Sequence, residues 1–520
     1  MKLNRSDVKP RAINVSDLFH EVMMARTRIY RLFPPTPLEI HSMPGDWRML
    51  LKREDLSEIH SFKWRGAFNF ISARALEAQT RGIVTASAGN HAQGVAKSAA
   101  LLQIKAHIFM PKSAPKLKVE SVARLGGRLV EIHQTGDSYS DAAQAAEGFC
   151  LTGGQLYVPP YNDLMVMAGQ GVLADEMMTC PERPDMVFVQ IGGGGLAAGV
   201  AGVLKSYDRN IEVIGVEAEG QASMTAAFKA GHPVPLEQVD IFCDGTAVKT
   251  AGNLTYPLLS TLLDDLITVS AKEVSAAVEE MWRVARVLPE PSGAMGLAAA
   301  RKSKRNLANK NVGVILSGAN LDFRRLSLIA KNLGDPTGHQ AFYQVTMPER
   351  RGTMLAFFKA IKPIGLNISY LMVGQVDTDI AYPVMGFEGM DRQFSSLEET
   401  MKKAGYEFKD VSDRPDITFR LAPFQPKLFK LPYAAILNFP ERPGALTEFL
   451  ERIASLANIS YFNYVHSGEE VGRALAVFSF ESKAKRDDFL FDLKANGPFF
   501  TDLAGDTNQA LGLTETFIGL

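Results

Sequence analysis

The chain has 520 residues, which is too long for a single hydrophobic core and predicts about three domains. Apolar residues make up 46% of the chain and charged residues 22%, the composition of a globular protein, and no apolar run is long enough to predict a membrane partner. Because the formal net charge is −1, there is no basic excess to attract a phosphate backbone, and we expect no nucleic-acid partner.

Up to about residue 330, short β-rich apolar runs alternate with helical patterns, which predicts a parallel α/β domain. Two predicted strands, at 185–195 and 311–320, run directly into glycine turns. Ligands of parallel sheets bind at the carboxyl ends of the strands, where these turns lie. Strands and helices are also predicted to alternate earlier in the chain, at 82–90, 91–102, 106–111 and 114–126.

An internal repeat follows a segment rich in Gly, Pro and polar residues at 332–340. Residues 347–361 match 439–453, and "NISY" at 367–370 recurs at 458–461. Each copy reads strand, glycine turn, helix, strand, strand, helix, which is the ferredoxin-like order. In the first copy the strands are expected at 341–347, 367–373 and 380–387 and the helices at 354–361 and 395–405. The predicted division is a first domain at 1–332, a linker at 333–340 and repeat domains at 341–420 and 432–510.

Four consecutive glycines, Gly192, Gly193, Gly194 and Gly195, precede Leu196 at the start of a predicted helix. Without side chains, the N–H groups of such a turn converge on an anion, and the helix dipole adds to the attraction. The pattern suits a phosphate monoester rather than a dinucleotide or a P-loop nucleotide. The alternative is a tight turn that only allows close packing.

Two other strand ends carry small polar residues that suit a ligand. In "SAGNH", Ser87 offers a hydroxyl, Asn90 an amide, and the turn through Gly89 and His91 offers N–H donors for a carboxylate. In "LSGAN", Ser317 offers a hydroxyl at the end of its strand. An ordinary helix N-cap and a turn serine are the alternatives.

Lys63 stands between Phe62 and Trp64 near a predicted helix start. Taken alone, it is a solvated surface lysine. A phosphate turn, a carboxylate turn and a lysine in one domain instead favour pyridoxal phosphate that is covalently attached to the lysine. Trp64 and Arg65 have no role that the sequence predicts.

Five segments, "SFKWRGA", "SAGNHAQGVA", "GGGGL", "EPSGA" and "LSGAN", occur in the order and spacing of the fold-type II pyridoxal phosphate enzymes. Among these, the chain resembles the biosynthetic threonine dehydratases (threonine ammonia-lyases). The C-terminal repeat resembles their pair of ACT-like regulatory domains. The resemblance implies an α/β catalytic domain of parallel sheets with flanking helices, followed by two ferredoxin-like domains.

The resemblance also implies roles for individual residues. Lys63 matches the lysine that carries the cofactor, Phe62 the ring beside it, and Asn90 the partner of the pyridoxal 3′-oxygen. Ser317 matches the partner of the pyridine nitrogen. The phosphate loop matches Gly192, Gly193, Gly194, Gly195 and Leu196, and the substrate-carboxylate turn contains Ser87, Gly89 and His91.

The expected reaction is the conversion of L-threonine to 2-oxobutanoate and ammonia, the first committed step towards isoleucine. A neutral hydroxyl at Ser317 leaves the pyridine nitrogen largely unprotonated, which favours β-elimination over transamination. Ala88 has no proton to exchange, which disfavours a racemase. The alternatives are a serine/threonine dehydratase of broader or degradative role and a catalytically dead amino-acid sensor.

The repeat domains carry no comparable catalytic cluster, so their own sequence is compatible with an oligomerisation module. The resemblance implies instead a sensor that binds isoleucine as inhibitor, with valine opposing it, and a homotetramer. Candidate effector residues lie at the glycine turns and nearby: Gly352, Leu355, Tyr370, Gly444, Leu446 and Tyr461.

The cysteines, Cys150, Cys180 and Cys243, are too few and too scattered for a disulfide framework and are not spaced as zinc ligands. We therefore expect reduced thiols and no metal site. The first residues carry charges but lack the apolar run of a secretory signal. Both observations favour a cytoplasmic protein.

Overall fold

The chain is described by a computed structural model and divides into two compact units, Met1–Phe323 and Arg324–Leu520. The structure describes residues 13–322, 325–333, 339–348, 353–372, 380–389, 391–412, 431, 433–440, 456–465, 471–496 and 500–502.

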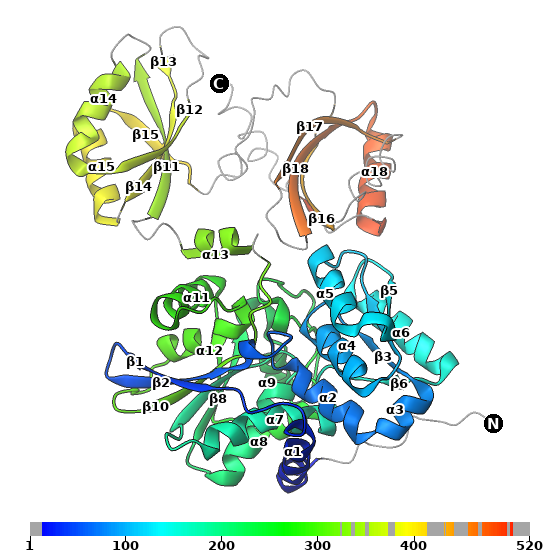
Figure 1. Cartoon of the computed structure of the whole chain (residues 1–520). Coiled ribbons are helices and arrows are strands. Elements are labelled where there is room, and N and C mark those ends of the chain that lie inside the picture. Colours follow the sequence, from blue (N-terminus) through cyan, green and yellow to red (C-terminus); the bar gives the residue numbers. More distant parts are fainter. Residues whose placement is uncertain are drawn as a thin grey trace. The chain divides into compact units, whose positions relative to one another are not determined.

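The first unit contains a six-stranded sheet in the order β1-β2-β10-β7-β8-β9. All neighbours are parallel except the hairpin of β1 with β2 at one edge. Helix α12 (Pro291–Lys302) contacts one face of this sheet and α8 (Gly195–Tyr207) the other (Figure 1). The strands are β1 (Leu38–Met43), β2 (Trp47–Arg53), β7 (Met186–Gln190), β8 (Glu212–Ala218), β9 (Asp265–Val269) and β10 (Asn311–Leu316).

A second sheet of the same unit has four parallel strands in the order β5-β4-β3-β6. Its strands are β3 (Ile83–Ala86), β4 (Ala106–Met110), β5 (Val130–Gln134) and β6 (Leu156–Tyr157). Helix α4 (Asn90–Leu102) follows β3, and α5 (Lys116–Gly126) follows β4. The predicted strand–turn–helix alternation and the parallel α/β class are therefore confirmed.

Other helices of the first unit flank these sheets. The α-helices are α1 (Val15–Ile29), α2 (Lys63–Ala73), α3 (Ala75–Arg81), α6 (Tyr139–Gly153), α7 (Leu164–Thr179), α8 (Gly195–Tyr207), α9 (Ser223–Ala230), α10 (Thr255–Leu262), α11 (Ala271–Ala285) and α12 (Pro291–Lys302). Short 3-10 turns lie at Glu54–Leu56, Gly127–Leu129, Glu219–Gln221 and Asp244–Thr246.

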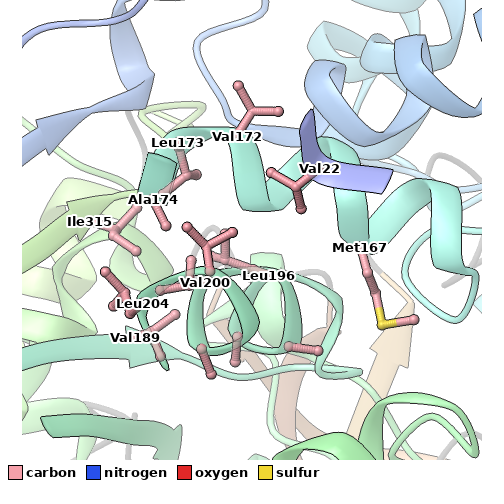
Figure 2. Close-up of a cluster of buried hydrophobic side chains, with 14 of the residues drawn as sticks. Val22, Met167, Val172, Leu173, Ala174, Val189, Leu196, Val200, Leu204 and Ile315 are labelled. Atoms are coloured by element: carbon pink, nitrogen blue, oxygen red, sulfur yellow. The ribbon is translucent and has the colours of Figure 1, made fainter. Parts of the chain in front are cut away.

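Helix α7 is the centre of the largest hydrophobic core. Figure 2 shows its apolar side chains facing those of α8, with Val22 of α1 beside them. Glycines let α7 approach its neighbours closely. A Cβ on Gly199 of α8 would lie 2.3 Å from the carbonyl oxygen of Met167, and one on Gly169 of α7 would lie 2.6 Å from that of Arg65 in α2. The backbones of α2, α7 and α8 are thus packed nearly in contact.

The second unit contains two antiparallel sheets, one of five strands and one of four, and four strands of the first sheet repeat the order of the second. In the first, β15 (Glu407–Asp410), β11 (His339–Pro348), β14 (Val384–Gly389) and β12 (Asn367–Met372) are neighbours in that order. In the second, the order is β19 (Phe500–Asp502), β16 (Tyr433–Pro440), β18 (Val471–Ser479) and β17 (Asn458–Val465). This is the expected ferredoxin-like arrangement, with a last strand that the sequence pattern did not predict.

The two copies also share an irregularity in their sheets. The ladder shifts register between Ile368 and Tyr370 in one copy and between Ile459 and Tyr461 in the other. A β-bulge at the same place in both copies is a designed feature rather than a defect. The shared position supports the prediction that the two segments are copies of one unit. The helices of this unit are α13 (Arg325–Leu333), α14 (Thr353–Ile361), α15 (Asp391–Lys403) and α18 (Lys483–Asn496).

One predicted strand of the first copy is wrong in detail. Residues 380–387 form two strands, β13 (Ile380–Ala381) and the start of β14, rather than one. Pro383 lies at the break, and proline has no N–H to donate to a ladder. Its carbonyl oxygen still accepts a hydrogen bond of 3.0 Å from the N–H of Val345.

The glycine contact between α7 and α8 gives a stability prediction. Gly199→Ala is expected to destabilise the first unit by about 1–3 kcal/mol because the added methyl overlaps backbone atoms that cannot move away. Gly148→Ala, on the exposed surface of α6 where a Cβ meets no atom within 4 Å, is the control. It should be neutral or stabilising by up to about 1 kcal/mol. Thermal unfolding of both variants measures the difference, and equal midpoints would contradict it.

Candidate active site

Lys63 is the first residue of α2, and Phe62 is its N-cap. Its Nζ donates a hydrogen bond of 3.2 Å to the carbonyl oxygen of Pro160 and lies 5.4 Å from the centroid of the Phe62 ring. The side chain is half-buried, and its desolvation lowers the pKa of Lys63 to about 8, against the opposing effect of Glu290. Lys63 is therefore not a solvated surface charge, and a larger share of its amine is neutral than in an exposed lysine at the same pH.

Arg65 fixes the start of α2 through a buried ion network. Its Nε donates to Glu54 at 2.8 Å and its Nη1 to Glu176 of α7 at 2.7 Å. Lys52 of β2 bonds the same Glu176 at 2.5 Å. Burial opposes the charge on Arg65, but the two carboxylates outweigh it and raise the pKa of the guanidinium above its usual value. Two cations and two carboxylates thus balance in the interior.

Trp64 lies next to Arg65 in this turn, and the guanidinium carbon of Arg65 is 5.0 Å from the centroid of the Trp64 ring. Trp64 is buried, and its ring lies 4.3 Å from that of Phe33. No role for Trp64 and Arg65 is predictable from the sequence, because the partners of both are distant in the chain. Together they hold the helix turn from which Lys63 extends.

The four-glycine turn joins β7 to α8 and tolerates no side chain. A Cβ on Gly193 would lie 2.3 Å from the ring of Tyr161, and one on Gly192 would lie 2.9 Å from the carbonyl oxygen of Thr246. Gly194 has φ of +94°, a conformation that favours glycine. Within the described residues, the N–H groups from Gly192 to Leu196 donate no hydrogen bond. Buried unpaired donors at a helix N-terminus are a ready anion site.

The turn after β3 leads into α4. The hydroxyl oxygen of Ser87 accepts a hydrogen bond of 3.2 Å from the N–H of Gly89. His91 is buried, and its Nε2 lies 3.1 Å from the carbonyl oxygen of Val158. Burial, with a smaller effect of Lys63, lowers the pKa of His91 to about 3, so the imidazole is neutral. Its Nε2 therefore donates to Val158, and the N–H of His91 remains for the turn.

The end of β10 and the segment that follows it connect Asn90 and Ser317 to the start of α2, the helix that begins at Lys63. The N–H of Phe62 donates to the carbonyl oxygen of Ser317 at 3.0 Å. Asn90 Nδ2 donates to Glu290 at 2.8 Å, while its Oδ1 accepts from Asn320 Nδ2 at 2.7 Å. The buried hydroxyl-bearing Ser317 and the Asn90 amide are thus both tied to the neighbourhood of Lys63.

Glu290 is a residue of this site to which the sequence interpretation assigned no role. Its carboxylate lies against Gly318, where a Cβ would come within 2.6 Å of Oε1. Burial, with a smaller effect of Asp244, raises the pKa of Glu290 to about 7. The motif "EPSGA" contained the signal, but its contacts with Asn90 and Asn320 appear only in the folded chain.

Together these contacts bring the strand-end segments around one amine. Pro160 accepts from Lys63 while Tyr161, the next residue, packs on the glycine turn. The arrangement combines an amine that can lose its charge, a glycine turn with unpaired N–H groups and the N-terminus of a second helix, α4.

Of the candidate effector residues, Leu355 is exposed on α14, and Tyr370 and Tyr461 lie in β12 and β17 at the bulges. Gly352, Gly444 and Leu446 lie outside the described residues.

Two segments of the chain match described protein families. Residues 29–318 match the pyridoxal-phosphate dependent enzymes, and residues 433–511 match the C-terminal regulatory domain of threonine dehydratase. The biosynthetic L-threonine dehydratase of Escherichia coli is 36% identical over 468 residues, which are 87% of this chain and 89% of the relative. The chain belongs to the threonine dehydratase family. It is accordingly a pyridoxal-phosphate-dependent lyase with a regulatory domain at its C-terminal end.

Other relatives agree with this family assignment. The biosynthetic L-threonine dehydratase of Haemophilus influenzae is 34% identical over 495 residues, which are 91% of this chain and 93% of that protein. A solved threonine deaminase from Solanum lycopersicum aligns with a TM-score of 0.58 at 36% identity, covering 63% of this chain and 96% of its own. Maize serine racemase aligns with a TM-score of 0.56 at 32% identity, covering 61% and 97%. Across the described residues, none of the helices has the length and apolar character needed to traverse a bilayer.

The ion network of Arg65 gives a prediction for the site. Arg65→Met leaves Glu54 and Glu176 buried without their guanidinium, so a loss of about 3–5 kcal/mol in stability is expected. Arg65→Lys should recover only part of the loss, because an ammonium group cannot bridge two carboxylates in bidentate fashion. Arg124→Met, on the exposed face of α5, is the control and should unfold like the parent. Thermal unfolding tests this, and a stable Arg65→Met variant would contradict it.

Proposed function

We propose that this protein dehydrates and deaminates L-threonine to 2-oxobutanoate and ammonia with pyridoxal phosphate bound at Lys63. The observation that carries the proposal is the half-buried Lys63 amine, which bonds the carbonyl of Pro160 and whose pKa is lowered to about 8 by desolvation. The names of the relatives, threonine dehydratases and a threonine deaminase, support the substrate.

The turn from Gly192 to Leu196 fits a phosphate group. Its unpaired N–H groups lie at the start of α8, and the close packing of Tyr161 and Thr246 leaves room for backbone only. These residues would hold the cofactor phosphate by hydrogen bonds and by the helix dipole. Phe62 would pack beside the ring. When bound, pyridoxal phosphate supplies a conjugated ring that accepts the electron pair released at the substrate Cα.

Lys63 acts as the general base. Burial disfavours its ammonium form, so the amine is available to take the proton from Cα of threonine. The Pro160 carbonyl holds Nζ in place between the turns that receive phosphate and substrate. The β-hydroxyl takes up a proton and leaves as water, so that the Cα proton and the hydroxyl are lost in equal number. Hydrolysis of the released enamine then gives the 2-oxo acid and ammonia.

The turn containing Ser87, Gly89 and His91 receives the substrate carboxylate. The N–H groups of Asn90 and His91 open α4, and within the described residues neither donates a hydrogen bond. A carboxylate there gains both donors and the favourable end of the helix dipole. The neutral His91 ring, bonded to Val158, fixes the turn without adding charge.

Asn90 and Ser317 set the polarity around the ring. The Asn90 amide is held by Glu290 and Asn320, and it would donate to the 3′-oxygen of the bound ring. Ser317 offers the ring nitrogen a neutral hydroxyl in place of a carboxylate, which limits protonation of that nitrogen. The weaker electron sink favours prompt elimination of the β-hydroxyl over transamination.

Racemisation is a second candidate activity because maize serine racemase shares 32% identity with this chain. It requires a proton donor on the face of Cα opposite Lys63. Ala88, next to the carboxylate turn, has no such proton. Elimination is therefore the better supported activity, and chiral analysis of unreacted serine and threonine distinguishes the two.

The C-terminal domains supply feedback control in this proposal. Isoleucine inhibits and valine opposes it at sites near Gly352, Leu355 and Tyr370 in one copy and at Gly444, Leu446 and Tyr461 in the other. The match of residues 433–511 to a regulatory family and the paired bulges at the two tyrosines support this. We place the enzyme in the cytoplasm and expect it to form a homotetramer. Sedimentation analysis tests this oligomeric state.

Lys63→Ala is expected to remove the visible absorbance of bound pyridoxal phosphate and the release of 2-oxo acid from threonine, because both need the amine. Lys116→Ala, at a lysine whose side chain is 90% exposed, is the matched control and should keep both. Absorbance spectra and a 2-oxo acid assay with threonine and with serine provide the measurements. Undiminished activity of Lys63→Ala would contradict the assignment.

A truncated variant that ends at Gly338 separates catalysis from regulation by isoleucine. Because the first unit ends at Phe323, this chain should remain active on threonine but lose its response to isoleucine. The full chain, assayed with and without isoleucine under the same conditions, is the control. An isoleucine response retained by the shortened chain would overturn the regulatory proposal and leave the catalytic one standing.

A further inference from the structure

Three side chains of the second sheet gather at its β5 edge, and none belongs to the proposed catalytic site. Glu131 and His133 are two residues apart on β5, so they point to the same face. His107 on the neighbouring β4 pairs directly with Glu131. The parallel register therefore places two imidazoles and one carboxylate together.

The distances among their ligand atoms are those of a coordination sphere. His107 Nδ1 lies 3.1 Å from His133 Nε2. Each of these nitrogens lies 3.6 Å from an oxygen of Glu131. Ligands that bind zinc tetrahedrally at about 2.0–2.1 Å are separated by about 3.3 Å. The three observed separations lie on either side of that value.

We propose that His107, Glu131 and His133 form a binding site for a divalent transition metal ion, and that zinc is the ion it suits best. Two imidazoles and one carboxylate are donors that zinc accepts. Glu131 is 67% exposed, so the ion enters from solvent and keeps a coordination position for water.

Aromatic packing holds the two imidazoles in this orientation. The His133 ring stacks on Phe109 with centroids 4.5 Å apart and planes 17° apart. The His107 ring lies 4.6 Å from that of Phe149 in α6. Side chains fixed by packing lose little freedom when an ion binds, which favours affinity. The bound ion would join β4 to the edge strand β5.

Zinc binding to the holoenzyme tests this site. After chelator treatment and its removal, equilibrium dialysis against Zn²⁺ should show an equivalent per chain that His107→Gln and His133→Gln each weaken by at least about 100-fold. His232→Gln, at an exposed histidine outside the cluster, is the control and should bind as the parent does. Unchanged binding in both cluster variants, or no binding by the parent, would overturn the site.

A second measurement guards against misfolded variants. Zinc should raise the thermal unfolding midpoint of the parent and of His232→Gln, but not that of His133→Gln. Because Phe109 and Phe149 remain in place, the variants should keep the parent's circular dichroism and cofactor absorbance without zinc. A zinc-induced rise of equal size in His133→Gln would contradict the proposal.

Discussion

The buried contact of Arg65 with Glu54 and Glu176 is the constraint on which the site depends. Its guanidinium is fully enclosed, and it joins the first turn of α2 to the 3-10 turn that follows β2 and to the central helix α7. Lys63 is two residues away on the same turn. Breaking a buried charge network leaves uncompensated charge, so the folded chain has few alternatives for the direction of that turn. The direction of the Lys63 side chain is therefore set by charged side chains that take no part in the reaction.

Glycines complete the same constraint at the level of the backbone. Gly169 and Gly199 let α2, α7 and α8 pack with almost no space between them, and Gly94 lets α4 approach the carbonyl of Lys63. Two of these helices, α4 and α8, begin at the turns proposed to bind carboxylate and phosphate. Close helix packing thus fixes where both anion sites lie relative to the amine, without any contact between the sites themselves.

Much of the fold was predictable from local pattern. The alternating strands and helices, the repeated ferredoxin-like units and the helix start at Lys63 follow from apolar periodicity and glycine position, which are local properties. The break at Pro383 and the last strand of each repeat were missed. A short, mostly exposed strand such as β15 has little periodicity of its own, and its pairing with β11 decides its structure.

The sequence by itself determined which chemical groups the protein has: a lysine, four glycines in a row, an amide and a hydroxyl at strand ends. It did not determine their surroundings. The lowered pKa of Lys63, the neutral state of His91 and the raised pKa of Glu290 all arise mainly from burial. So does the meeting of His107 with Glu131 and His133, which depends on the register of β4 and β5. Only the tertiary structure decides such properties, because desolvation and contacts between distant residues do not exist until the chain folds.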